Sequence, residues 1–280
     1  MTHANGLIEI DHFGLNYGAM AAVADVSLTV RPGEFVSILG PSGCGKSSLL
    51  NAVAGFIRPT YGEVAVDGVP IRRPGADRGM VFQQYSLFPW KTVRQNVEFG
   101  LKMKGVGVDE RERKARTLLS LSGLIGFEDH YPDRLSGGMK QRVGIVRALA
   151  TGPKVLLLDE PFGALDAQTR VIMQQILTNI WQRLGITVLF VTHDIDEAIF
   201  LSDRVYVMTA RPGKVKAELP VLLPRPRDPE EMMTPGFLAL RRELAGLIRE
   251  ESLRAMGSEV AAGLGGIDVT PGDGALADLL

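Results

Sequence analysis

Gly40-Pro41-Ser42-Gly43-Cys44-Gly45-Lys46-Ser47 matches the pattern G-x-x-x-x-G-K-[ST] at every fixed position. Glycines let consecutive backbone N–H groups curl around phosphate oxygens, while Lys46 suits the β- and γ-phosphates and the Ser47 hydroxyl suits Mg²⁺. The apolar run 34–39 predicts a buried strand before this phosphate loop, and residues 48–54 predict a helix that ends at Gly55. A strand, a glycine loop and a helix in this order predict a nucleotide-binding α/β core.

A second glycine-containing helix start follows far along the chain. It reads Leu135-Ser136-Gly137-Gly138-Met139-Lys140-Gln141-Arg142 and precedes a helical pattern. A helix start exposes free backbone N–H groups, which bind anions. The two glycines let the backbone approach the anion closely, and the serine adds a hydroxyl donor. The chain is therefore expected to present two separate phosphate-binding surfaces.

Several continuous apolar runs predict fully buried parallel strands. They occupy residues 155–159, 187–191 and 204–208, and helical patterns at 167–184 and 194–201 separate them. Such alternation predicts an α/β sheet with helices on both faces, in which ligands bind at the carboxyl ends of the strands. The phosphate loop, Asp159 and His193 all fall at such ends.

Polar residues at these strand ends suit phosphate chemistry. Asp159 is expected to hold Mg²⁺ and Glu160 to orient or polarise the attacking water. His193 follows the strand at 187–191, where its imidazole can hydrogen-bond the γ-phosphate. Gln83, after a strand at 80–82, is expected to sense the metal or the water.

The remaining chain divides into simpler segments. Residues 7–17, 26–30 and 62–68 predict half-buried strands, and 93–122 predict helix with a charged, solvated face. Prolines from Pro220 to Pro235 break any long element, and residues 236–256 predict a charged amphipathic helix. The acidic, glycine-rich end, 257–280, is expected to be mobile, with docking on a partner as the alternative.

Composition limits which partners and which cellular compartment the chain can have. A net charge of −1 does not suggest a polyanion-binding surface, so no nucleic acid partner is expected. Cys44 is the single cysteine, which excludes an internal disulfide and suits a reducing compartment; its thiol also offers reagents a way to block the loop. The first residues lack a secretory signal, and no apolar run reaches the roughly 18 residues of a membrane span. These observations predict a cytosolic chain that reaches a membrane only through a partner.

Together these motifs resemble the nucleotide-binding subunit of ATP-binding cassette (ABC) transporters, over roughly residues 7–216. The resemblance implies a phosphate-loop core with an N-terminal antiparallel β subdomain and a helical subdomain inserted at about 90–150. It implies a cassette over 1–220; after it, the prolines and the helical pattern indicate a proline-rich linker and C-terminal helix over 221–256. It also implies that Asp166, in the D-loop Ala164-Leu165-Asp166, contacts a second copy of the chain.

By the same resemblance, residues 135–142 are the signature, Gln83 the Q-loop residue and His193 the switch histidine. Tyr17 is the ring expected to stack on adenine. The ATP-binding residues so implied are Tyr17, Gly40, Pro41, Ser42, Gly43, Cys44, Gly45, Lys46, Ser47 and Ser48, with Ser136, Gly137 and Gly138 acting from the other subunit. The implied Mg²⁺ ligands are Ser47, Gln83 and Asp159, beside catalytic Glu160, His193 and Gln83.

A finer resemblance is to importers of nitrate, sulfonates, taurine, bicarbonate and pyrimidine precursors. It rests on residues 81–90 and on Arg211-Pro212-Gly213-Lys214. It implies two membrane permease subunits, an extracytoplasmic solute-binding protein and a peripheral position on the cytoplasmic face of the inner membrane. Phe88 and Trp90 are either anchors for the permease or core of the helical subdomain.

Rival classes fit the sequence less well. ABC proteins of DNA repair carry long coiled coils, those of translation carry two cassettes, and exporters are commonly fused to membrane spans. The alternative that stays open is a soluble ABC ATPase not coupled to transport. The transported solute cannot be read from this subunit.

Overall fold

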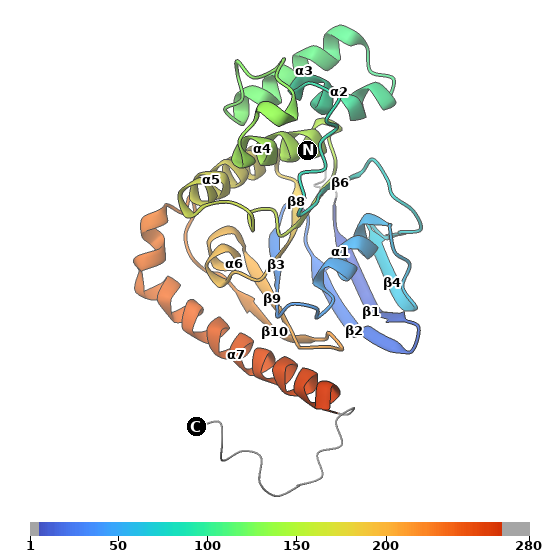
Figure 1. Cartoon of the computed structure of the whole chain (residues 1–280), viewed down its shortest axis with the longest axis vertical. Coiled ribbons are helices and arrows are strands. Elements are labelled where there is room, and N and C mark those ends of the chain that lie inside the picture. Colours follow the sequence, from blue (N-terminus) through green and yellow to red (C-terminus); the bar gives the residue numbers. More distant parts are fainter. Residues whose placement is uncertain (1–5, 265–280) are drawn as a thin grey trace, which may run out of the picture.

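A six-stranded central sheet organises the described part of the chain, which in this computed structural model comprises residues 6–264, with side chains through Met256 (Figure 1). Its strand order is β10-β9-β3-β8-β7-β6. The strands are β3 (Phe35–Leu39), β6 (Arg78–Val81), β7 (Val155–Asp159), β8 (Thr187–Thr192), β9 (Arg204–Met208) and β10 (Val215–Pro220). All neighbours pair in parallel except β10, which runs antiparallel to β9 at the edge. The expected α/β core with a mostly parallel sheet is confirmed.

The burial of these strands explains why the sequence predicts them. Every residue of β3 and β8 is buried, and β7 is buried up to Asp159. Strands covered on both faces need apolar side chains at successive positions, which gives continuous runs rather than alternation. Helices α5 (Ala167–Leu184), α6 (Ile195–Leu201) and α7 (Pro235–Leu264) contribute side chains to the core on one face of the sheet.

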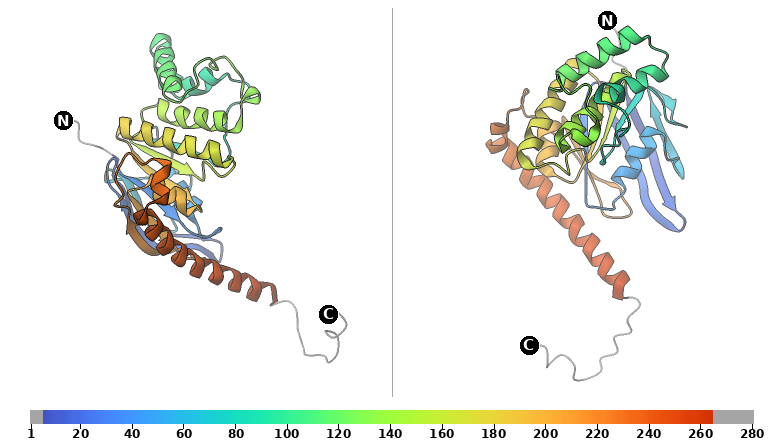
Figure 2. Two further views of the ribbon diagram at one scale, coloured as in Figure 1. Left: turned by 90° about the vertical axis from the view of Figure 1, so that its left-hand side faces the viewer. Right: turned by 45° about the horizontal axis from the view of Figure 1, so that its top comes forward.

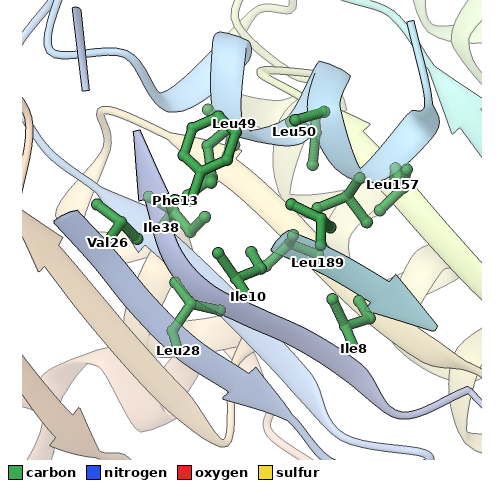
Figure 3. Packing of buried hydrophobic residues seen from close by; sticks show 14 of the residues in the cluster. Ile8, Ile10, Phe13, Val26, Leu28, Ile38, Leu49, Leu50, Leu157 and Leu189 are labelled. Atoms are coloured by element: carbon green, nitrogen blue, oxygen red, sulfur yellow. The ribbon is translucent and has the colours of Figure 1, made fainter. Parts of the chain in front are cut away.

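A second, antiparallel sheet covers the opposite face together with helix α1 (Lys46–Ala54). Its order is β2-β1-β4-β5, formed by β1 (Ile8–Tyr17), β2 (Met20–Val30), β4 (Tyr61–Val66) and β5 (Val69–Pro70). Figure 3 shows Ile10 and Leu28 of this sheet packing toward Leu189 of the central sheet. This layer is the expected N-terminal antiparallel subdomain, and it fixes the position of Tyr17.

Helices α2 (Val93–Met103), α3 (Val108–Leu121) and α4 (Gly137–Ala150) form a separate layer with its own apolar cluster. They gather at the end of the molecule opposite the far end of α7 (Figure 2). A short 3₁₀ turn, η1 (Pro132–Arg134), leads into α4. The single helical pattern predicted over 93–122 is in fact two helices, because Gly105 adopts a left-handed φ of 75° between them.

The C-terminal region differs from expectation in two ways. The sequence does not predict strand β10, because the prolines around it indicate irregular chain. Pro220 has no N–H to donate, but it is tolerated because it ends an edge strand. After the 3₁₀ turn η2 (Pro229–Met233), helix α7 continues to Leu264 and not only to Met256. Residues 257–264 are helical because the two glycines, at 257 and 263, cost only about 1 kcal/mol each and the segment contains no proline. The rest of the acidic end, 265–280, lies outside the described residues.

Candidate active site

The phosphate loop, residues 40–47, connects β3 to α1 and curls through two left-handed glycines. Gly43 has φ 73° and Gly45 has φ 99°, a region in which residues with a Cβ are strained. Gly45 is also the residue that precedes α1, so the free N–H groups of the helix start face the loop. Lys46 is buried, and its Nζ donates to the carbonyls of Gly40 at 2.8 Å and Pro41 at 2.9 Å. The loop therefore presents N–H donors and one cation at the same place.

A pocket of about 410 Å³ opens beside this loop. Its lining comes from the phosphate loop, from the β1–β2 turn, and from the ends of three other segments. The lining residues are Tyr17, Met20, Ala22, Ser42, Gly43, Gly45, Lys46, Ser47, Ser48, Gln83, Glu160 and Arg211. The half-exposed Tyr17 ring stands at one side, with its hydroxyl 3.4 Å from the Ser48 hydroxyl. An aromatic ring beside a phosphate loop is suited to stacking a base.

Oxygen donors for a divalent cation meet at the start of α1. The Ser47 hydroxyl donates to Oδ1 of Asp159 at 2.9 Å, and exposed Gln83 lines the same pocket. Burial raises the pKa of the Asp159 carboxyl, and the neighbouring Glu160 adds to that rise, whereas Ser47 and Lys46 lower it. Hydroxyl, amide and carboxylate oxygens are the donors that Mg²⁺ prefers, so these three residues fit the ion.

Glu160 and His193 form the second polar pair of the site. Oε2 of Glu160 lies 3.1 Å from Nδ1 of His193, although the two residues follow different strands, β7 and β8. Glu160 has φ 42°, which is rare for a residue with a side chain, and its N–H donates to the carbonyl of Val191 at 2.9 Å. Strained backbone of this kind is concentrated at functional sites. Glu160 lines the pocket, where its carboxylate can accept a proton from water.

Three predicted loop residues do not line the pocket. Gly40 and Pro41 contribute carbonyls to Lys46 instead, and Cys44 is buried at 1 % exposure. Burial raises the pKa of the Cys44 thiol, against the opposing effect of Lys46. A protonated and covered thiol reacts slowly, so the cysteine is a structural part of the loop in this structure.

The second phosphate-binding surface that the sequence predicts, at Ser136–Gly138, lies outside this pocket. Ser136 is exposed and caps α4, accepting a hydrogen bond from the Met139 N–H at 3.3 Å. Neither Ser136 nor Gly137 nor Gly138 lines the pocket of the same chain. The N-terminus of α4 is thus an anion-compatible surface without a phosphate loop of its own.

Asp166 and Arg170 lie at the start of α5, and Arg170 also contacts the residue that follows His193. Asp166 is exposed and caps α5 by accepting from the Thr169 N–H at 3.0 Å, which is the main cause of its lowered pKa. Arg170 donates to the Leu165 carbonyl at 3.1 Å and to Asp194, next to His193, at 3.4 Å. Arg170 thus connects the residue before Asp166 with the residue after His193.

Comparison with known proteins decides the family. The family model described as ABC transporter matches residues 23–163, half of the chain. The chain belongs to the ABC transporter family. The resemblance inferred from the motifs is confirmed by this match.

Individual ABC proteins are similar over most of the chain. The nitrate import ATP-binding protein NrtD of Synechocystis sp. is 50% identical, over 83% of this chain and 90% of its own length. The taurine import ATP-binding protein TauB of Burkholderia pseudomallei is 52% identical, over 71% of this chain and 77% of its own. An uncharacterized ABC transporter ATP-binding protein of Methanocaldococcus jannaschii is 49% identical, over 87% and 90%.

Solved ABC cassettes share the fold. The dimeric cassette MJ0796 superposes with a TM-score of 0.69 at 37% identity, covering 76% of this chain and 98% of its own. A post-hydrolysis form of that cassette, bound to ADP and Pi, gives a TM-score of 0.67 at 36% identity. The ABC ATPase fold is confirmed, and ATP hydrolysis is the activity of this family.

The structure gathers most of the predicted residues, and adds others. Tyr17, Gln83, Glu160 and much of the phosphate loop share one pocket, while their individual roles stay predictions. Sequence reasoning missed Arg211, Met20 and Ala22, which also line that pocket. The only signal for Arg211 was its presence in an Arg-Pro-Gly turn, which says nothing about what the side chain contacts. No helix within residues 6–264 is long and apolar enough to cross a bilayer.

Proposed function

We propose that this ABC cassette hydrolyses ATP to power import of a small solute of the nitrate, sulfonate, taurine or pyrimidine-precursor type. The observation that carries the proposal is the pocket that the phosphate loop and Glu160 line together, with Asp159 hydrogen-bonded to Ser47 at its edge. The importer class is supported by relatives named for nitrate and taurine import. Both relatives align with this chain over more than two thirds of their own length.

The chemistry follows from the positions of these side chains. The phosphate-loop N–H groups and Lys46 hold the phosphate chain and balance the charge that develops on it. Glu160 orients the attacking water and accepts its proton, while His193 holds the carboxylate and reaches the γ-phosphate. Ser47, Gln83 and Asp159 would hold Mg²⁺, which supplies positive charge beside the β- and γ-phosphates.

The site becomes complete only in a pair of chains. Ser136, Gly137 and Gly138 of one copy would cover the ATP held by the phosphate loop of the other, in a head-to-tail dimer with Asp166 at the contact. The exposed Ser136 and its absence from the pocket of its own chain support this arrangement. A solved relative described as a dimeric cassette supports pairing. ATP then lies between two subunits and joins them.

The wider assembly includes two membrane permease subunits and an extracytoplasmic solute-binding protein. The cassette would lie at the cytoplasmic face of the inner membrane as a peripheral subunit. Residues 1–220 form the cassette in this proposal, with the helical subdomain at about 90–150 facing the permease. The separate apolar cluster of α2, α3 and α4 supports that division.

Isolation of the tagged chain from its own cells in mild detergent tests the proposal. Stoichiometric recovery of two multispanning membrane proteins is expected, with ATPase activity in the complex. Loss of uptake of radiolabelled nitrate, taurine or orotate on deletion of the gene would then identify the solute class. Recovery of an active ATPase from the soluble fraction alone would instead favour a soluble ABC ATPase uncoupled from transport.

A further inference from the structure

The turn that joins β9 to β10 lies directly against the phosphate loop. The Gly213 N–H donates to the Ala22 carbonyl at 3.0 Å, and the Gly213 carbonyl accepts from the Ala24 N–H at 2.9 Å. A Cβ placed on Gly213 would lie 2.0 Å from the Cys44 carbonyl oxygen. Backbone contact this close requires glycine, so the turn and the loop are held in one fixed arrangement.

Arg211 extends from this turn into the wall of the 410 Å³ pocket beside the phosphate loop, the proposed nucleotide pocket. Its Nε and Nη2 donate to the carbonyl of Gly43 in the phosphate loop at 3.2 and 3.1 Å. Its Nη1 lies 3.4 Å from the sulfur of Met20, which is a weak acceptor. A guanidinium has five N–H donors in a planar fork, so this one retains donors for a stronger acceptor.

The charges around the pocket indicate what that acceptor is. Lys46 and Arg211 are the cations among its lining residues, and Lys46 is buried at the helix end of the loop. Arg211 lies beside Gly43 and Met20, in the wall of the same pocket. Phosphate oxygens bind a guanidinium fork more strongly than a carbonyl or a thioether sulfur does, so the phosphate chain of a nucleotide bound in this pocket is the acceptor that suits Arg211.

A buried carboxylate of α7 fixes the residue just before Arg211. Oε2 of Glu251 accepts from the Ala210 N–H at 2.9 Å, and Oε1 accepts from Lys216 Nζ at 2.8 Å. Glu251 is 1% exposed, so this carboxylate is held on both oxygens away from water. Figure 1 shows α7 running along the edge of the molecule past β9 and β10. Helix α7 is thus connected to the pocket beside the phosphate loop. Glu251 holds the N–H of Ala210, and the next residue, Arg211, lines that pocket.

We infer that Arg211 contacts the phosphate chain of ATP, and that Glu251 is its positioning residue. The inference rests on the proposed function, because it assigns a further contact to the same ATP site. It gives the C-terminal helix, which follows the cassette, a direct part in nucleotide affinity.

Binding of three ligands to the purified chain tests the Arg211 contact. Arg211→Ala should raise the Kd for ATP and for ADP about tenfold, as expected for loss of a charge-assisted hydrogen bond. The Kd for adenosine, which lacks phosphates, should change less than twofold. Arg211→Lys should recover part of the affinity, and Lys214→Ala, in the same turn but outside the pocket lining, is the matched control.

The three binding measurements distinguish a phosphate contact of Arg211 from a contact with the base and from no contact at all. An equal loss for ATP and adenosine would overturn the phosphate contact and assign Arg211 to the base or to the shape of the loop. Unchanged affinities would exclude any contact. Lys46→Ala tests the underlying site: if the wild-type chain and Lys46→Ala bind ATP equally, the proposed function itself is wrong.

A double-mutant cycle tests the role of Glu251. Glu251→Gln should raise the Kd for ATP several-fold, and should have no further effect when Arg211 is already alanine. Glu250→Gln is the control, because Glu250 shares Lys216 at 2.6 Å but does not contact Ala210. Additive effects of the two substitutions would reject a positioning role and leave Glu251 as a general support of the fold.

Discussion

Glu160 Oε2 and His193 Nδ1 lie 3.1 Å apart, at the ends of two neighbouring parallel strands. The pairing register brings Asp159 opposite Val191, and the Glu160 N–H bonds to that same Val191. The carboxylate therefore reaches His193 through the geometry of the sheet itself.

Glu160→Gln should retain ATP binding and lose nearly all hydrolysis. The amide keeps the size of the side chain and a contact with His193, but cannot accept a proton from water at neutral pH. Turnover is expected to fall at least 100-fold, with ATP-bound dimers accumulating in size-exclusion chromatography. Wild-type turnover in this variant would remove Glu160 from the catalytic role.

Ser136→Asp should stop turnover without affecting ATP binding by the monomer. Aspartate keeps the cap on α4 but places a negative charge where the partner's γ-phosphate is expected. Ser136→Asn is the matched variant, since it caps the helix without charge and should retain more activity. A parallel loss of monomer binding and turnover would contradict a site shared between subunits.

Glu197 should make the stability of the chain depend on pH. It is buried on α6, accepts from the Thr192 hydroxyl at 2.8 Å, and burial raises its pKa to about 7 from a model-compound 4.5. Because the folded state holds the proton more tightly than the unfolded chain, this stabilisation is complete below pH 4.5 and is lost as pH rises through 7.

Glu197→Gln, which stays neutral, should escape that loss. Between pH 4.5 and pH 8 the free energy of unfolding of the wild type should fall by roughly 3 kcal/mol more than that of Glu197→Gln. Urea unfolding at several pH values measures the difference. A constant difference over this range would mean that folding does not raise the pKa of Glu197.

Phe88 and Trp90 should respond differently to truncation. Phe88 is half-buried, with its ring 4.7 Å from Phe99 and the Arg147 guanidinium 5.5 Å from its centroid, whereas Trp90 is 69% exposed. Phe88→Ala should lower the free energy of unfolding by about 1–3 kcal/mol, and Trp90→Ala by less than about 0.5 kcal/mol. Denaturant titration of both variants decides this.

Trp90→Ala should instead weaken recovery of the membrane subunits with the chain. A large exposed aromatic ring is the type of residue that anchors protein interfaces. Full recovery of the complex would leave Trp90 without an assigned partner. Of the two interpretations open from the sequence, the structure gives Phe88 packing contacts on several sides. Trp90 contacts Phe88, with 5.7 Å between the ring centroids, but most of its side chain stays exposed.

The central sheet and the phosphate loop were predictable because their signals are local. Strands β3, β7 and β8 are apolar at successive positions, and the loop is specified by glycines needed at fixed backbone angles. The placement of Glu160 and His193 at strand ends followed from the same patterns. Their contact did not, because the strand register that creates it carries no local signal.

Arg211 could not be found in this way. Its partner Gly43 lies 168 residues earlier, and a turn has no periodicity that would point its side chain toward a site. Glu251 was equally hidden, since a glutamate in a charged helix is expected on the solvated face. Strand β10, which holds the turn in place, was obscured by the prolines near it.

The separation of Ser136 from the pocket of its own chain has a genetic consequence. Two alleles, Lys46→Ala and Ser136→Asp, would each give a dimer in which both composite sites are defective. A mixed dimer would concentrate both lesions in one site and leave the other wholly wild type. Coexpression of the two silent alleles should therefore restore growth on the imported solute, whereas coexpression of two different phosphate-loop alleles should not.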